Sequence, residues 1–169
     1  MLISELGLRS QFNRAKAAGW LPFFMSGDYG MRGPILMGIA SRESNLSQVV
    51  GDYGLDGRPN GFSLMQIDKR SYPEWVASGK WKDVGTAVKM GAFVLRSKYN
   101  QAEAGGVPAG DLMRVAVAMY NAGGHALHDY LIHGAAGADY RTTGHDYSAD
   151  VLARTAVFER LLAPLTNPY

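Results

Sequence analysis

The chain has 169 residues, no cysteine, 47% hydrophobic residues and a formal net charge of +2. This length fits one domain with a substantial core, and the hydrophobic content excludes an intrinsically disordered chain. The near balance of 17 basic and 15 acidic residues excludes a strongly basic nucleic-acid-binding domain, and the lack of cysteine excludes disulfides and thiolate metal sites.

Residues 2–18 predict a first helix that ends at Gly19. Its expected inward positions are Leu2, Leu6, Phe12 and Ala15. The start of this segment has neither a basic n-region nor a long apolar stretch, so no signal peptide is visible. An aromatic segment follows at residues 20–25 and predicts core packing or a short helix. The longest apolar stretches, such as residues 34–40, are too short to span a bilayer, so we expect no stable membrane insertion.

A second predicted helix begins near Gly33, where Pro34 suits the first turn, and ends just past Glu43. Its apolar stripe has helical period and consists of Ile35, Leu36, Ile39 and Ala40. Glu43 occupies the next position on that stripe. Burial raises the pKa of a carboxyl group, so Glu43 would stay protonated near neutral pH, as a general acid requires. The alternative is that Glu43 ends its helix in water or pairs with Arg42.

Residues 51–61 are rich in Gly, Asp, Pro and Asn, which predicts turns and short hairpins, and residues 62–68 predict a short strand. Three more helices are expected over residues 84–99, 111–120 and 147–163. Asp111 is expected to cap the second of these, and Pro164 to stop the third. The predicted fold class is therefore α+β and mostly helical, with one small β-rich segment.

The Gly-rich segment and the predicted strand carry three acidic residues, Asp52, Asp56 and Asp68. Hydrolysis of a glycosidic bond needs one protonated carboxylic acid and one ionised carboxylate. An apolar helix face and a polar loop are environments that would supply these two roles. Aspartates in such loops also form turns through their own hydrogen bonds, so the spacing alone leaves both interpretations open.

Four motifs of the chain resemble, in order, the signature of goose-type lysozymes. They are Ile-Ala-Ser-Arg-Glu-Ser at 39–44, Asp-Gly-Arg-Pro-Asn-Gly-Phe-Ser-Leu-Met-Gln-Ile-Asp-Lys-Arg-Ser at 56–71, Met-Tyr-Asn-Ala-Gly at 119–123, and Thr-Thr-Gly-His-Asp-Tyr at 142–147 with Asp-Val-Leu-Ala-Arg at 150–154. The third is also similar to a motif of soluble lytic transglycosylases. The resemblance covers roughly residues 34–160.

This resemblance implies a lysozyme-like fold in which the β-rich segment forms one wall of the active-site cleft, with residues 1–169 as a single catalytic domain. It implies a glycoside hydrolase, a muramidase that cleaves the β-1,4 bond between N-acetylmuramic acid and N-acetylglucosamine with inversion. Glu43 would be the general acid, and Asp68 one of the residues that position water. We expect Asp56 to be the other, because its separation from Glu43 fits the motif, and Asp52 is the alternative.

The resemblance also implies substrate-binding residues. Tyr120 and Asn121 would face the cleft from a helix end, and Tyr147 from the start of the last helix. Gln66 would bond the acetamido groups of the sugars, or else satisfy backbone groups. Tyr72 stands where the family often has His, which alters sugar contacts rather than the acid–base chemistry.

Ser63 replaces a glycine that is common in the family. The disulfides of vertebrate members are absent, which points to a microbial or phage-like member, such as a bacteriolytic, antimicrobial endolysin. Such a protein would act on the bacterial cell wall after delivery by lysis, a holin or another route.

His125, His128 and His133 lie in the predicted loop after the Tyr-Asn-Ala-Gly motif, with Asp129 nearby. Three imidazoles can bind zinc, but this spacing lacks the Glu of the metalloprotease motif. We expect solvated histidines, and neither a metal nor a cofactor.

Three alternative functions remain open at this point. A lytic transglycosylase would form 1,6-anhydro products, and a chitinase would act on plain N-acetylglucosamine polymers. A glycan-binding or phage structural module would need no acid, so the presence of Glu43 and Asp68 argues against it. The expected partner is a peptidoglycan or chitin-like glycan, with no nucleic acid, and the expected state is a monomer.

Overall fold

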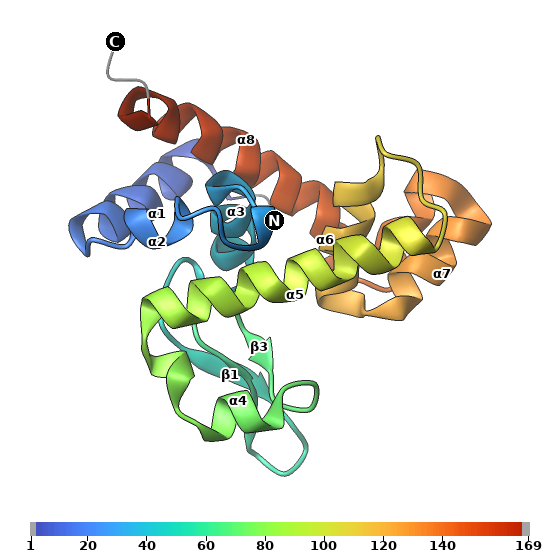
Figure 1. The fold of residues 1–169 in the computed structure, drawn as a ribbon, viewed down its shortest axis with the longest axis horizontal. Helices are drawn as coiled ribbons and strands as arrows, with labels where there is room; N and C mark the ends of the chain where they lie inside the picture. Colours follow the sequence, from blue (N-terminus) through green and yellow to red (C-terminus); the bar gives the residue numbers. More distant parts are fainter. Residues whose placement is uncertain (1–2, 167–169) are drawn as a thin grey trace.

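Helices form most of the structure, a computed structural model that describes residues 3–166 (Figure 1). They are α1 (Glu5–Ala17), α2 (Leu21–Phe24), α3 (Gly33–Ser44), α4 (Pro73–Ala77), α5 (Val84–Ala104), α6 (Leu112–Ala122), α7 (Gly124–His133) and α8 (Tyr147–Thr166). Short 3-10 turns are η1 (Asp28–Gly30), η2 (Lys80–Lys82), η3 (Gly134–Asp139) and η4 (Thr143–His145). Three strands, β1 (Val50–Tyr53), β2 (Pro59–Phe62) and β3 (Ile67–Asp68), form an antiparallel sheet in that order. The prediction of a mostly helical α+β fold is confirmed.

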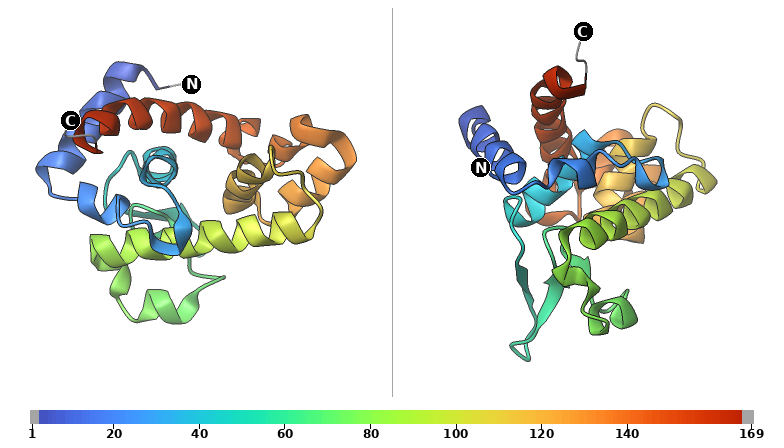
Figure 2. Two further views of the ribbon diagram at one scale, coloured as in Figure 1. Left: turned by 45° about the horizontal axis from the view of Figure 1, so that its top comes forward. Right: turned by 60° about the vertical axis from the view of Figure 1, so that its left-hand side comes forward.

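Helix α3 lies at the centre of the main core, and most of its residues are buried. It packs closely against α8, because a Cβ added at Gly38 would lie only 2.5 Å from Oγ1 of Thr155 and 2.9 Å from the carbonyl oxygen of Val151. A second core cluster joins the end of α5 to α6, α7 and η3. Figure 2 shows these two helical regions at opposite ends of α5. Among the described residues, no helix has both the length and the apolar character needed to cross a bilayer.

The sheet extends away from the helices, together with α4, on one side of α5 (Figure 1, Figure 2). Gly51 pairs with Gly61 across the β1–β2 hairpin, and Gly61 pairs with Asp68 on β3. A side chain at Gly61 would collide with Oε1 of Gln66, which lies across this glycine pair. The glycines therefore let a glutamine side chain lie flat against the hairpin.

The first helix differs from its prediction. It begins at Glu5, because the Ser4 side chain accepts the N–H of Gly7 and caps the helix, and the expected inward position Leu2 falls outside the described residues. Leu6 is 77% exposed, so its prediction as an inward residue is wrong, whereas Phe12 and Ala15 are buried as predicted. Leu8 and Gln11 complete the buried face, which has the helical spacing of Leu8, Phe12 and Ala15.

Two further predictions, for Pro164 and for the segment after residue 123, are wrong, and the prediction for Asp111 holds only in part. Pro164 does not stop α8, since it lies within the last turn, where it removes only one backbone hydrogen bond and Leu162 stays buried. Asp111 occupies the N-cap position of α6 but makes no capping bond, because its carboxylate accepts the hydroxyl of Tyr130 at 2.5 Å. The segment after the Tyr-Asn-Ala-Gly motif is the helix α7 rather than a loop.

Candidate active site

A cavity of about 600 Å³ lies between the sheet and the helices. The predicted site residues that line it are Glu43, Gln66, Asp68, Tyr72, Tyr120 and Asn121. They come from α3, the sheet with the segment that follows it, and α6. The structure therefore brings together motifs that lie as much as 78 residues apart, from Glu43 to Asn121.

Glu43 lies in the last turn of α3. The helix ends immediately afterwards, because Asn45 and Leu46 both adopt left-handed backbone angles, with φ of 55° and 54°. The hydroxyl of Ser44 donates to the carbonyl oxygens of Ala40 at 2.9 Å and Leu64 at 2.8 Å. These contacts fix the end of α3, and hence Glu43, relative to the turn between β2 and β3.

Burial raises the pKa of Glu43 from its ordinary value of 4.5 to about 7. The hydroxyl of Tyr147 donates a hydrogen bond to Oε1 of Glu43 and, with the positive charge of Arg42, opposes this rise, whereas the negative charge of Asp52 adds to it. Tyr147 is itself only 1% exposed, and burial together with the Glu43 charge raises its pKa well above 10. Tyr147 therefore remains a hydrogen-bond donor at any working pH.

Asp68 has the opposite environment. Partial burial raises its pKa, but the Ser71 hydroxyl at 2.8 Å and the Arg70 guanidinium at 2.9 Å outweigh this and lower the pKa below its usual value. The backbone N–H of Ser71 also donates to this carboxylate, at 3.2 Å. The cleft thus has one carboxyl group that holds its proton near neutral pH and another that is ionised.

Asp52 and Asp56 have different locations. Asp52 lines the cavity from β1, and one of its carboxylate oxygens lies 3.6 Å from a guanidinium nitrogen of Arg70. Asp56 lies in the hairpin turn, where its carboxylate accepts the backbone N–H of Arg58 at 3.0 Å, and it does not line the cavity. The sequence-based preference for Asp56 over Asp52 does not fit this geometry, because the Asp56 carboxylate is bound within the hairpin turn, whereas Asp52 lines the cavity.

The remaining predicted residues are largely occupied by contacts within the chain. The hydroxyl of Tyr120 donates to the carbonyl oxygen of Met65 at 2.8 Å. The Asn121 side chain accepts the N–H of Thr143 at 2.8 Å and donates to its hydroxyl at 3.3 Å. Tyr72 packs edge-on against Phe93, with 6.4 Å between the ring centroids. These side chains shape the wall of the cleft and hold neighbouring segments in place.

Gln66 satisfies backbone groups, which is the alternative that the sequence left open. Its amide nitrogen donates to the carbonyl oxygens of Ser63 at 2.8 Å and Val49 at 3.2 Å. Ser63 has a φ of 73°, in the left-handed region that favours glycine. Its hydroxyl accepts the N–H of Met65 at 3.2 Å, which supports the turn. The serine at this position thus keeps a backbone conformation that suits the family's usual glycine.

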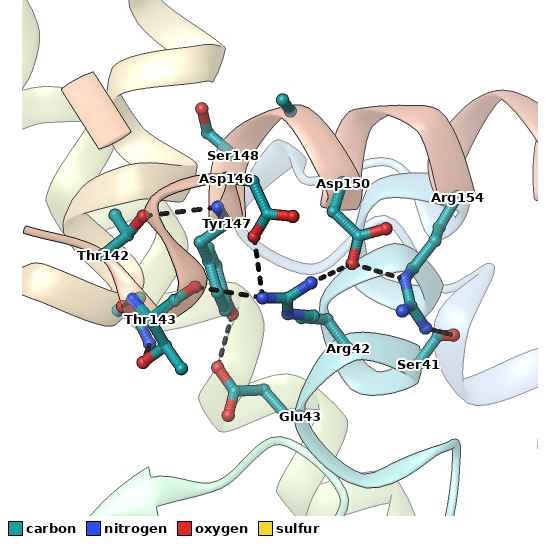
Figure 3. A network of polar contacts seen from close by, with 12 residues as sticks. Ser41, Arg42, Glu43, Thr142, Thr143, Asp146, Tyr147, Ser148, Asp150 and Arg154 are labelled. Carbon is teal, nitrogen blue, oxygen red and sulfur yellow. Dashed lines mark hydrogen bonds and ion pairs between the residues drawn. The ribbon is translucent and has the colours of Figure 1, made fainter. Parts of the chain in front are cut away.

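Sequence reasoning missed the polar network behind Glu43 (Figure 3). Arg42 points toward α8, where it forms ion pairs with Asp146 and Asp150 rather than with Glu43. Arg154 donates to the same Asp150 at 3.0 Å and to the hydroxyl of Ser41 at 2.8 Å. The spacing of Asp150 and Arg154, four residues apart on a predicted helix, was the available signal for part of this network.

The three histidines lie on α7 but do not converge. His125 contacts Arg141 at 3.0 Å, His128 contacts Asp129 at 3.2 Å, and the His133 ring packs against Tyr140. Within residues 3–166, no three His, Cys, Asp or Glu side chains group closely enough to hold a metal ion.

Comparisons with known proteins agree on one family. The family model described as Lysozyme g matches residues 25–161. A lysozyme g of Casuarius casuarius is 31% identical over 128 residues, which cover 75% of this chain and 64% of the relative. A lysozyme g of Cyprinus carpio is 32% identical over 132 residues, which cover 73% of this chain and 63% of the relative. A lysozyme g of Gallus gallus is 31% identical over 129 residues, which cover 75% of this chain and 56% of the relative. The chain therefore spans less than two thirds of the length of these curated relatives.

Proposed function

Because the chain belongs to the lysozyme g family, we propose that it is a muramidase, a glycoside hydrolase that cleaves the β-1,4 bond between N-acetylmuramic acid and N-acetylglucosamine in peptidoglycan. The observation that carries this proposal is the contrast between two carboxyl groups of the cleft. Glu43 has a pKa of about 7, whereas hydrogen bonds keep the pKa of Asp68 low. Glycoside hydrolysis needs such a pair.

In the proposed mechanism, Glu43 protonates the leaving glycosidic oxygen while Asp68 and Asp52 hold the attacking water on the opposite face of the sugar. Both aspartates line the same cavity as Glu43, which supports this arrangement. Asp56 is not assigned this role, because its carboxylate is bound in the hairpin turn. Attack by water from the opposite face inverts the anomeric centre, which is the outcome expected when about 6.5–9.5 Å separates the carboxyl groups.

The proposed site belongs to one chain, since its acid, its aspartates and its walls all come from residues 43–143. We therefore propose that residues 1–169 act as a single catalytic domain and as a monomer on the bacterial cell wall. Tyr72, which lines the cleft, is the proposed packing surface for a sugar face. Tyr120 and Asn121 are proposed to support the same wall.

The decisive experiment replaces Glu43 with Gln and measures the clearing of bacterial walls by turbidity. We expect Glu43→Gln to lose turnover while circular dichroism and the cooperativity of unfolding stay unchanged, because the amide cannot donate the proton. The exposed Glu74 of α4 provides the matched control, and Glu74→Gln should clear walls normally. Appreciable clearing by Glu43→Gln would disprove the assignment.

The products decide between hydrolysis and transglycosylation. Mass spectrometry of the released muropeptides should find reducing ends, because the ionised Asp68 can orient water. 1,6-anhydro ends would identify a lytic transglycosylase instead. Parallel incubation with chitin oligosaccharides tests the chitinase alternative. Release of N-acetylglucosamine units would show chitinase activity.

A further inference from the structure

Arg42 immediately precedes the proposed general acid in the chain. Its side chain nevertheless points toward α8 and does not line the cleft (Figure 3). Its side chain is 18% exposed, and its guanidinium has three partners. One nitrogen donates to Oδ2 of Asp150, which is almost fully buried, and the other lies 3.0 Å from both Oδ1 of Asp146 and the carbonyl oxygen of Thr143. A planar guanidinium suits such a fork of acceptors, which an ammonium could not satisfy together.

These contacts hold the segment that leads into Tyr147. Thr143 and Asp146 both belong to the turn before α8, and the N–H of Asp150 donates to the carbonyl oxygen of Asp146 at 2.8 Å as α8 begins. Asn121 holds Thr143 from the other side. Arg42 therefore ties the helix that carries Glu43 to the segment that carries the hydroxyl partner of Glu43. The Arg42 guanidinium carbon also lies 5.7 Å from the centre of the Tyr147 ring.

The charges of this network nearly cancel. Arg42 and Arg154 face Asp146 and Asp150, so two positive groups meet two negative groups. An arginine without these carboxylates would favour the ionised form of the neighbouring Glu43 more strongly. The groups that face Glu43 from the surrounding elements are Arg42 of α3, Asp52 of β1, Tyr120 of α6 and Tyr147 of α8.

We propose that Arg42 is a positioning residue that holds Tyr147 against Glu43, and that Asp146 offsets the positive charge of Arg42 at the general acid. The catalytic consequence rests on the proposed function, in which Glu43 donates the proton. Arg42 does not line the cavity, so its effect on turnover must pass through Tyr147 and Glu43.

The charge part is tested with Asp146→Asn, which keeps an oxygen acceptor for Arg42 but removes the negative charge. Asp146 is 43% exposed, so this substitution leaves the core intact. The readout is a carbon-13 NMR titration of the glutamate carboxyl groups, in which the Glu43 signal is identified by its absence from Glu43→Gln. We expect the Glu43 midpoint to fall by about half a pH unit, the size expected for one partly screened charge. An unchanged midpoint overturns this part.

The positioning part is tested with Arg42→Lys, which keeps the charge but loses the fork. We expect kcat for wall hydrolysis to fall about tenfold while KM is unchanged, because the lysine no longer fixes the turn before Tyr147. In a Tyr147→Phe background, Arg42→Lys should have little further effect, since the interaction that it supports is already absent. Independent, additive losses in the double variant overturn the positioning role and leave Arg42 as a structural residue.

A matched control exists in the same pair of elements. Arg32, immediately before α3, pairs with Glu159 of α8 at 2.7 Å, away from the cleft. Arg32→Lys and Glu159→Gln should change neither the Glu43 titration nor kcat. Because the NMR titration needs no activity, failure of the proposed muramidase function and failure of this inference are distinguishable.

Discussion

Replacement of Glu43 by Gln should make the protein more stable at alkaline pH. The folded pKa of Glu43 is about 7, above its ordinary value of 4.5, so the native state binds this proton more tightly than the unfolded chain does. Stability from this group is therefore fully present below about pH 4.5 and is lost as the pH rises through about pH 7. The difference in pKa corresponds to about 3 kcal/mol, and water in the open cleft reduces the expected effect to about 2 kcal/mol.

Glutamine has nearly the same shape, carries no charge at any pH, and keeps an oxygen that can accept the hydroxyl of Tyr147. The free energy of unfolding of Glu43→Gln, relative to the unmodified protein, should therefore rise by about 2 kcal/mol between about pH 4.5 and about pH 9. Urea unfolding at a series of pH values measures this difference, with equal m-values as the sign that the unfolded states are comparable.

Exposed Glu74 serves as the control, because Glu74→Gln should produce no such pH-dependent gain. Parallel pH profiles for the unmodified protein and Glu43→Gln would refute the reasoning. They would mean that the folded and unfolded states bind the proton of Glu43 equally well, and the proposed general acid would then lose its electrostatic basis.

Three other variants test separate parts of the structure. Tyr147→Phe should raise the pKa of Glu43, because the donated hydrogen bond favours the ionised form, and the alkaline limb of the pH–rate profile should move to higher pH. Asp52→Asn should lower turnover about a hundredfold whereas Asp56→Asn stays near normal, as measured by the rate of wall clearing; the reverse result would restore Asp56 as the water-positioning residue. Gly38→Ala should destabilise the fold by about 1–3 kcal/mol in urea, despite the better helix propensity of Ala, because its methyl group would lie 2.5 Å from Oγ1 of Thr155.

The helix that carries Glu43 could be predicted because its signals are local. Pro34 marks the first turn, the apolar stripe repeats with helical period, and Glu43 continues that stripe. The same pattern predicts the contrast between a half-buried glutamate and aspartates in a polar loop. The family motifs then indicate which residues share a cleft. The helical period of the apolar residues alone does not predict this.

The errors have equally specific causes. The sequence of helix α7 does not predict a helix, because its flanking glycines and its histidines are typical of a loop. Ala126 and Tyr130 nevertheless bury one face of α7 in the second core cluster. The prediction of Leu6 as an inward residue fails because the buried face of α1 begins at Leu8. The partners of Arg42 lie more than 100 residues away in the chain, so no local pattern reports them.

The hydrogen bond between Glu43 and Tyr147 joins residues 104 positions apart. Its two halves therefore emerge from the ribosome at well-separated times, and a nascent or truncated chain that stops before residue 147 lacks the phenol that holds the carboxyl group. Contacts of such long sequence separation also form late and slowly, since closing a long loop costs entropy before the contact is gained. The order of synthesis thus postpones the completed acid until residue 147 has been made.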